Sequence, residues 1–329
     1  MTGTLILKRS DVAALLDLES CIASVEQAFR MHHEGATLPP GVLGVPSTGG
    51  GFHIKAAGLK LDRVYFAAKV NANFSENKKR FGLPAIQGVV LLCDGESGYP
   101  LALKDSIEIT IIRTGAATAV AAKYLARPDS RVATIAGCGN QGRIQLKSLL
   151  KVLNLDLVYA FDRDEAMAQT FARDIRDETG LDVRPVRDLA EAAPQSDVVV
   201  TCTPSREPFL RVEHVRPGTF IAAVGADSED KQELDPGLLA ANTVVVDLIE
   251  QCAAIGELHH ALKKGLMEKG DVHAELAEVI SGGKAGRSSS EEIIVFDSTG
   301  TALQDVAAAA VVYRKALEEG LGTPLNFAD

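Results

Sequence analysis

Short apolar runs alternate with segments of helical periodicity through most of the chain. The stretch from Asp164 to Gly180 is one such helical segment, because Asp164 can cap its start and Gly180 can end it. Six apolar runs predict buried strands: Val132 to Ala136, Leu157 to Phe161, Val198 to Cys202, Phe220 to Val224, Val244 to Asp247 and Ile293 to Phe296. This alternation predicts an α/β fold with a parallel sheet.

The first third of the chain follows a different pattern. Apolar residues between Ser20 and His33 recur at helical spacing, and residues 35–51 are rich in Gly and Pro, which predicts a loop or an irregular strand. Two runs, Ile86 to Cys93 and Tyr99 to Lys104, flank a turn at Asp94 to Gly98 and predict a β-hairpin. An antiparallel hairpin does not open a doubly wound fold, so we predict a separate domain here.

Composition and charge exclude several functional classes. The 329 residues are 46% hydrophobic and 24% charged, as in ordinary globular proteins, and the net charge of -10 leaves no overall cationic field for nucleic acid or a membrane surface. The purest apolar stretch, Val306 to Tyr313, is far shorter than the roughly 18 residues of a spanning helix, so we expect a soluble cytoplasmic protein. Five scattered cysteines and the histidines at 259, 260 and 273 lack metal-ligand spacing, which predicts neither disulfides nor a metal site.

A glycine-rich loop follows the first predicted strand of the parallel sheet. Gly137, Gly139 and Gly142 form the pattern GxGxxG, with Asn140 and Gln141 between them, at the point where a helix is expected to begin. The glycines permit a tight turn, and the helix N-terminus offers N–H donors and a favourable dipole to a pyrophosphate. The loop therefore predicts a dinucleotide site, although a simple strand-to-helix turn would need similar residues.

An acidic residue lies where such a site needs one. Asp162 ends the second predicted strand, twenty residues after Gly142, and can accept hydrogen bonds from both hydroxyls of an adenine ribose while repelling a 2′-phosphate. This favours NAD(H) over NADP(H). Arg163 keeps NADP(H) open, because its guanidinium could pair with a 2′-phosphate.

The last expected helices complete the domain prediction. A helix from Arg113 to Ala126 precedes the parallel sheet, and an Ala-rich helix from Thr301 to Gly320 could pack back onto the first domain. We predict a smaller α+β domain of residues 1–120 with 304–329, and the family resemblance given next implies that this domain binds substrate and forms the dimer. Residues 121–303 would then form a Rossmann dinucleotide-binding domain.

Several separated motifs together resemble the ornithine cyclodeaminase/mu-crystallin family. They are Arg113 to Ala117, the GxGxxG loop, Gly225 to Ser228 with Lys231 to Asp235, Gly256 to Leu258, and Phe296 to Gly300 with Leu303 to Asp305. The resemblance spans nearly the whole chain, and the motifs occur in the family's order. It implies a Rossmann domain plus a second domain, a homodimer, and hydride transfer between nicotinamide and the Cα of an amino or imino acid.

The resemblance also implies roles for individual residues. Lys69 and Arg113 match positions that bind the substrate carboxylate, and Arg113 also matches a position that could bind a cofactor phosphate. Asp227 matches the catalytic acid/base, and Lys69 is the second residue to which the resemblance gives a catalytic role. Further positions match cofactor contacts: Thr203, Val224, Gly225, Lys231 and Ser298. On spacing alone, a lysine in an apolar strand usually reaches solvent, an arginine at a helix start is usually a surface residue, and an aspartate after Gly-Ala is usually part of a turn or a cap.

The chain departs from the cyclodeaminase pattern in one segment. Cyclodeaminases carry a second carboxylate-binding arginine and a glutamate for the ornithine ammonium before the lysine. Here residues 31–62 contain no arginine, and the matching segment reads Phe52-His53-Ile54-Lys55. A buried ammonium without its partner costs about 3–5 kcal/mol, so ornithine fits poorly. His53 and Lys55 add positive charge that would suit a second substrate carboxylate.

We therefore predict an NAD(H)-dependent imine reductase or amino-acid dehydrogenase. Its substrate would be a small amino or imino acid, and the positive charge of His53 and Lys55 favours one with a second carboxylate, such as iminosuccinate or aspartate. Two alternatives stay open at this stage. One is a cyclodeaminase that releases ammonia from ornithine or lysine, and the other is a non-catalytic mu-crystallin-like protein that binds NAD(P)H.

Overall fold

The computed structural model describes residues 3–327, which divide into two compact units. Unit 1 consists of residues 1–113 with 301–329, and unit 2 of residues 114–300. The first boundary falls inside helix α4 (Ile107–Leu125), and the second directly precedes helix α12 (Ala302–Glu319). Within residues 3–327, no helix is both long and apolar enough to cross a membrane.

Unit 2 is built on a fully parallel sheet with the order β13-β12-β14-β11-β10-β7-β8-β9. The strands are β7 Val132–Ala136, β8 Leu157–Phe161, β9 Asp182–Val186, β10 Val198–Thr201, β11 Phe220–Ala223, β12 Thr243–Val246, β13 Ala274–Glu275 and β14 Ile294–Asp297. The chain winds outward from β7 through β8 on one side and from β10 on the other. The strand order therefore reverses at the carboxyl ends of β7 and β10, the place where Rossmann folds bind dinucleotides.

Helices and short 3-10 turns connect these strands. They are α5 Asn140–Leu149, α6 Glu165–Thr179, α7 Leu189–Ala192, η1 Ala193–Gln195, η2 Val212–His214, α8 Pro236–Ala240, α9 Ile249–Ile255, α10 Glu257–Lys263, η3 Lys269–Asp271 and α11 Leu276–Ile280. The predicted caps of α6 are confirmed. The Asp164 side chain accepts from the Ala166 N–H at 3.0 Å, and Gly180 ends the helix with a φ of 73°. The α/β class and the Rossmann fold of this unit follow from these elements.

Unit 1 holds a seven-stranded sheet with the order β15-β1-β6-β5-β4-β3-β2. Its other elements are β1 Thr4–Leu7, α1 Arg9–Leu15, α2 Leu18–His33, β2 Thr37–Ser47, β3 Gly50–Lys60, β4 Val64–Asn73, α3 Asn77–Phe81, β5 Ile86–Asp94, β6 Pro100–Asp105 and β15 Thr323–Leu325. The predicted hairpin is β5–β6, and the Gly/Pro-rich segment is the irregular edge strand β2, whose register shifts between Leu38 and Gly41. Among the strands of residues 3–327 in this sheet, β1 and β6 pair in parallel and the other pairs are antiparallel.

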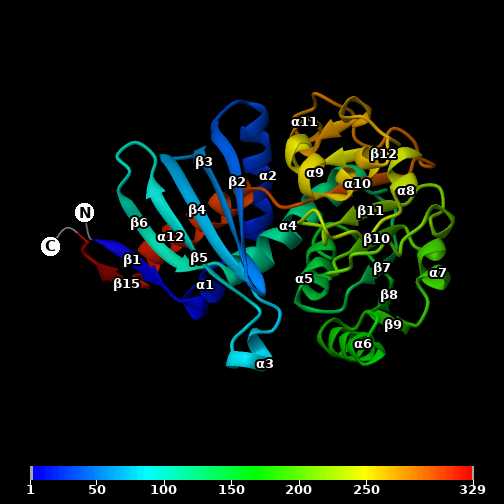
Figure 1. Ribbon diagram of the computed structural model, residues 1–329, viewed down its shortest axis with the longest axis horizontal. Helices are drawn as coiled ribbons and strands as arrows, with labels where there is room; N and C mark the ends of the chain where they lie inside the picture. Colours follow the sequence, from blue (N-terminus) through cyan, green and yellow to red (C-terminus); the bar gives the residue numbers. More distant parts are fainter. Residues whose placement is uncertain (1–2, 328–329) are drawn as a thin grey trace. The chain divides into compact units, whose positions relative to one another are not determined.

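The two faces of the unit 1 sheet differ in what covers them. Helix α12 packs along β3 and β4 and against α2, as Figure 1 shows for the red helix beside these strands. Strand register places a set of apolar side chains on the opposite side, which we call the outer apolar face: Leu43, Val45, Phe52, Ile54, Val70 and Val89. Leu43 keeps 57% of its surface exposed and Val89 42%. Unit 1 thus leaves a row of β-branched and aromatic side chains facing outward.

Helix α4 begins earlier than the sequence suggested. We expected Arg113 to open it, but the helix starts at Ile107, so Arg113 lies two turns inside. The first turns are rich in β-branched residues, which favour strands when taken alone. Asp105 supplies the missing start signal, because its carboxylate accepts from the N–H groups of Ile107 (2.9 Å) and Glu108 (3.3 Å).

Candidate functional site

The glycine-rich loop of unit 2 adopts a shape that its glycines permit. Gly137 follows β7 with a φ of 106°, and a Cβ there would lie 2.8 Å from the Cys202 carbonyl oxygen. A Cβ at Gly142 would lie 2.0 Å from the Gly137 carbonyl oxygen, so the start of α5 could not pack so closely on β7 with a side chain there. Both positions need glycine for close backbone approach, as a dinucleotide loop does.

The remaining loop positions leave room for an anion. A Cβ at Gly139 would meet no atom within 4 Å, and Gly139 precedes α5 without any side chain capping the helix start. Asn140 and Gln141 form the first residues of α5, so their N–H groups belong to its positive end. An uncapped helix N-terminus beside open space fits a pyrophosphate.

Asp162 lies against the same loop. One carboxylate oxygen accepts from the Cys138 N–H at 2.8 Å, and the other accepts from the Asp164 N–H at 3.0 Å. These two donors fix the carboxylate at the end of β8, where it could receive ribose hydroxyls. Arg163, next to it, is exposed.

Other predicted cofactor residues follow the carboxyl ends of further strands of unit 2. Thr203 follows β10, Val224 and Gly225 follow β11, and Ser298 follows β14, where its hydroxyl donates to Asp247 at 3.1 Å. Asp227 and Lys231 lie in the loop after β11 and form an ion pair at 2.6 Å. The predicted residues of unit 2 therefore gather at the edge of the parallel sheet that is formed by the carboxyl ends of its strands.

In unit 1, one carboxylate joins Lys69 and Arg113. The Lys69 ammonium on β4 donates to Asp305 of α12 at 2.8 Å, and the Arg113 Nε donates to the same carboxylate at 3.1 Å. All three side chains are at least 94% buried. Arg113 also donates to Gln304 Oε1 at 2.9 Å, and Lys69 lies 3.4 Å from Thr110 Oγ1.

A third cation adjoins this cluster. Lys55 on β3 is directly opposite Lys69 and is 7% exposed, and His53 lies two residues away on the same face. Burial lowers the pKa of Lys69 to about 7, with Arg113 and Lys55 adding to the effect against the opposing charge of Asp305. Burial alone would raise the pKa of Asp305, but its cationic neighbours hold that pKa below the usual value. Lys69 and Arg113 thus place two cationic side chains on one carboxylate.

Asp305 and Gln304 were not among the site residues predicted from the sequence. Both belong to the Leu303 to Asp305 motif. Their hydrogen-bond partners are far away in the chain, because Lys69 precedes Asp305 by 236 positions and Arg113 precedes Gln304 by 191. A usable signal was present, since Asp305 is a lone carboxylate within the apolar stretch of α12. A charge buried on an apolar helix face generally has a partner.

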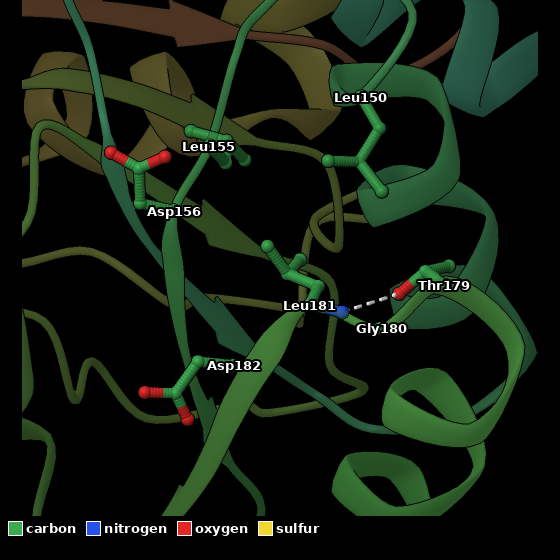
Figure 2. Close-up of a pocket in the computed structure, with 7 residues that line it drawn as sticks. All are labelled: Leu150, Leu155, Asp156, Thr179, Gly180, Leu181 and Asp182. Carbon is green, nitrogen blue, oxygen red and sulfur yellow. Dashed lines mark hydrogen bonds between the residues drawn. The ribbon is translucent and has the colours of Figure 1, made fainter.

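A hollow elsewhere in unit 2 does not belong to this set. It measures about 500 Å³ and lies at the amino ends of β8 and β9, opposite the glycine-rich loop (Figure 2). It is lined by Leu150, Leu155, Asp156, Thr179, Gly180, Leu181 and Asp182, and the Leu181 N–H donates to Thr179 Oγ1 at 3.2 Å. Across residues 3–327, no group of three or more His, Cys, Asp or Glu side chains could hold a metal ion.

The sequence matches the model of the ornithine cyclodeaminase/mu-crystallin family over residues 2–320. It is 41% identical to the alanine dehydrogenase of Archaeoglobus fulgidus over 326 residues, which is 98% of each chain. It is 31% identical to the iminosuccinate reductase of Paracoccus denitrificans, over 96% of this chain and 98% of the reductase.

Solved structures agree with this fold over the whole chain. An archaeal alanine dehydrogenase dimer with bound NAD has a TM-score of 0.95 at 40% identity, covering 99% of both chains. The Thermococcus litoralis Δ1-pyrroline-2-carboxylate reductase, in complex with NADH and L-proline, has a TM-score of 0.93 at 36% identity, covering 98% of this chain and 100% of the other. The Paracoccus denitrificans iminosuccinate reductase with NAD+ has a TM-score of 0.90 at 29% identity, over 99% and 100%.

Proposed function

Because the chain belongs to the ornithine cyclodeaminase/mu-crystallin family, we propose that it is an NAD(H)-dependent oxidoreductase of small amino or imino acids. The family relatives include dehydrogenases and reductases that act on amino or imino groups. NAD(H) supplies the hydride acceptor or donor when it is bound. The protein has to hold the substrate and cofactor in place and manage charge on the substrate nitrogen.

One observation carries the substrate proposal. Two buried cations, Lys69 and Arg113, share the Asp305 carboxylate, although buried charges in proteins are normally balanced. An α-carboxylate bound there would offset the excess positive charge. The Arg113 guanidinium suits bidentate carboxylate binding, and the Lys69 ammonium adds a point charge.

The cofactor proposal rests on unit 2. The uncapped start of α5 and the open space at Gly139 suit the pyrophosphate, and Asp162 suits the adenine ribose. Thr203, Gly225, Lys231 and Ser298 would complete the cofactor contacts, with Arg113 as a further candidate for a phosphate. These residues fit NAD(H), the cofactor present in the three structures described above.

We assign the acid/base role to Asp227. Its carboxylate is more than half exposed and shares the Lys231 ammonium, so it can exchange a proton with a substrate nitrogen or balance the charge of an iminium. Lys69 would hold the substrate carboxylate beside the reacting carbon. The Asp227→Asn variant tests this role, since an enzyme loses turnover but still binds NADH, whereas a pure binding protein is indifferent.

The surroundings of His53 on β3 bear on the side chain of the substrate. His53 lies on the Lys55 face of β3, directly opposite Asn71, whose amide oxygen accepts from Ser106 Oγ at 2.6 Å. These polar surroundings suit a second carboxylate better than an alkyl group. We therefore propose a dicarboxylic substrate such as iminosuccinate or aspartate.

Substrate choice can be measured through loss of NADH absorbance. Iminosuccinate should be reduced with the highest kcat/KM, ahead of pyruvate with ammonia and of Δ1-pyrroline-2-carboxylate. Lys55→Met should lower kcat/KM for iminosuccinate by about tenfold or more, and lower it less for the monocarboxylic substrates. Lys60→Met, on the exposed end of the same strand, is the matched control. Failure of every substrate would refute the oxidoreductase proposal.

The two alternatives give different signals in the same assay. A cyclodeaminase would release ammonia from ornithine or lysine at constant NADH. A mu-crystallin-like protein would bind NADH without turnover, and Asp227→Asn would not alter that binding.

We further propose a homodimer, in keeping with the archaeal alanine dehydrogenase dimer, with the outer apolar face as its interface. The cytoplasmic location stays a prediction from the sequence.

A further inference from the structure

Four buried carboxylates lie at the carboxyl edge of the unit 2 sheet and have no role in the proposed chemistry. Glu233, Asp247 and Asp297 are 0% exposed and Glu257 1%. Their recorded partners are mostly backbone N–H groups and hydroxyls of the loops that follow the strands. Such bonds fix loop backbone in place, because a carboxylate oxygen accepts strongly from an N–H that water cannot reach.

Glu233 joins two of these loops. One carboxylate oxygen accepts from the Thr203 N–H at 2.6 Å and from its hydroxyl at 2.7 Å, and the other accepts from the Gly225 N–H at 3.0 Å. The Glu233 carboxylate fills the space beside Gly225, because a Cβ at Gly225 would lie 2.5 Å from the Glu233 carboxyl carbon. The bond to Gly225 closes residues 225–233 into a loop, and that loop carries Asp227 and Lys231.

Glu233 is itself held by the next carboxylate. Glu257 accepts from the N–H groups of Glu233 (2.7 Å) and Leu234 (3.2 Å). Asp297, at the end of β14, accepts from the Leu258 N–H at 2.9 Å and so fixes the start of α10, where Glu257 lies. A Cβ at Gly256 would lie 2.6 Å from Asp297 Oδ2, so this contact also excludes any side chain there. Hydrogen bonds of Asp297, Glu257 and Glu233 therefore link the end of β14 to the loops after β10 and β11.

We propose that Glu233 is a positioning residue, whose carboxylate fixes Thr203 and Gly225 for the cofactor and closes the loop that presents Asp227. The inference rests on the proposed function, because it assumes that these residues face cofactor and substrate. Burial raises the pKa of Glu233, and the bonds from Thr203 and Gly225 oppose that rise. A carboxylate in this position has acceptors for all three donors, whereas an amide would turn an N–H toward one of them.

The first test compares Glu233→Gln with Glu229→Gln, which removes the same charge from an exposed side chain of the same loop. In Glu233→Gln, the NADH dissociation constant should rise about tenfold and kcat should fall about tenfold or more. Glu229→Gln should stay within about twofold of the unmodified protein. If Glu233→Gln is folded and keeps the unmodified NADH affinity and kcat, the proposal is wrong.

Coupling to Asp227 separates positioning from general support of the fold. If Glu233 acts through Asp227, Glu233→Gln should lower kcat markedly in the unmodified background and only slightly in Asp227→Asn. An equal fold-loss of kcat in both backgrounds overturns the link to Asp227. The NADH affinity needs no substrate, so it still tests the cofactor part if no substrate is turned over and the proposed function fails.

A second pair of variants covers the case in which Glu233→Gln does not fold. Thr203→Val removes the hydroxyl donor to Glu233, and Thr203→Ser retains it. We expect Thr203→Val to bind NADH about threefold or more weakly than Thr203→Ser does. Equal NADH affinity in the two variants overturns the proposal.

Discussion

At the scale of single residues, two buried lysines of unit 1 differ in their partners. Lys69 donates to the Asp305 carboxylate, while Lys104 on β6 donates to the Ala309 carbonyl oxygen at 2.7 Å and lies 5.8 Å from the Tyr313 ring centroid. Lys104 is only 1% exposed. Burial lowers its pKa to about 7 from an ordinary 10.5. No carboxylate of residues 3–327 pairs with this ammonium, so its charge destabilises the folded state.

Lys104→Met should make the protein more stable at pH 6 than the unmodified chain. The folded pKa lies below the unfolded one, so the cost of the ammonium is complete below about pH 7 and disappears as the pH rises toward 10.5. Methionine removes that cost, which we expect to amount to about 1–4 kcal/mol at pH 6 and less at pH 9. Thermal melts at both pH values measure the difference.

Lys60→Met is the control for this change, because Lys60 is exposed on β3 and its ammonium is hydrated in both states. It should shift the melting temperature little at either pH. A Lys104→Met protein that is less stable than the unmodified chain at pH 6 would show that the ammonium contributes more than its burial costs.

At the scale of elements, two glycines next to helices have opposite expected roles. Gly139 precedes α5 with a φ of -80° and open space around its missing Cβ, whereas Gly180 ends α6 in the left-handed region with a φ of 73°. Gly139→Ala should leave the melting temperature unchanged and weaken NADH binding by about tenfold or more, since the methyl would occupy the pyrophosphate space.

Gly180→Ala should do the reverse. Alanine at a left-handed position costs about 1 kcal/mol of stability, while NADH affinity should stay unchanged because Gly180 lies at the far end of α6 from the glycine-rich loop. Melting curves and NADH fluorescence titrations read the two effects separately. Loss of stability without loss of affinity in Gly139→Ala would contradict the assigned role of that residue.

Elements were predictable where local pattern and tertiary role agree. The six apolar runs became strands within one residue at each end, because strands buried on both faces need continuous apolar sequence. The edge strand β9 was missed, since Asp182, Arg184 and Pro185 give it no apolar run. Loop residues of the site were predictable from their place after strands. Asp305 and Glu233 were not given roles, because their partners are distant in the chain and no local pattern encodes them.

At the scale of the whole molecule, the outer apolar face is the feature that most requires a partner. Leu43 on β2, Val70 on β4 and Val89 on β5 are 57%, 36% and 42% exposed, and contiguous apolar patches of this kind mark interfaces. A second copy of the chain is the partner that the proposed homodimer supplies. A symmetric pairing would bring the same face of both copies together.

Val70→Glu combined with Val89→Glu should convert the dimer into monomers. Two carboxylates on each copy would be buried without partners, which should raise the dissociation constant by about a hundredfold or more. Sedimentation velocity over a range of concentrations measures this. Leu266→Glu, at a half-exposed leucine of unit 2, is the control and should leave the dimer intact. A dimer that survives the double change would place the interface elsewhere.

The return of α12 to unit 1 also sets the order in which the molecule can be completed during synthesis. Unit 2 is one continuous stretch that is finished at Gly300, and all its parallel strands are then present. Unit 1 still lacks α12, which brings its row of buried alanines and valines and the carboxylate shared by Lys69 and Arg113. Residues 1–113 are therefore made long before α12. Until α12 is added, their apolar core stays open and Lys69 and Arg113 lack the Asp305 carboxylate, a state that is prone to aggregation.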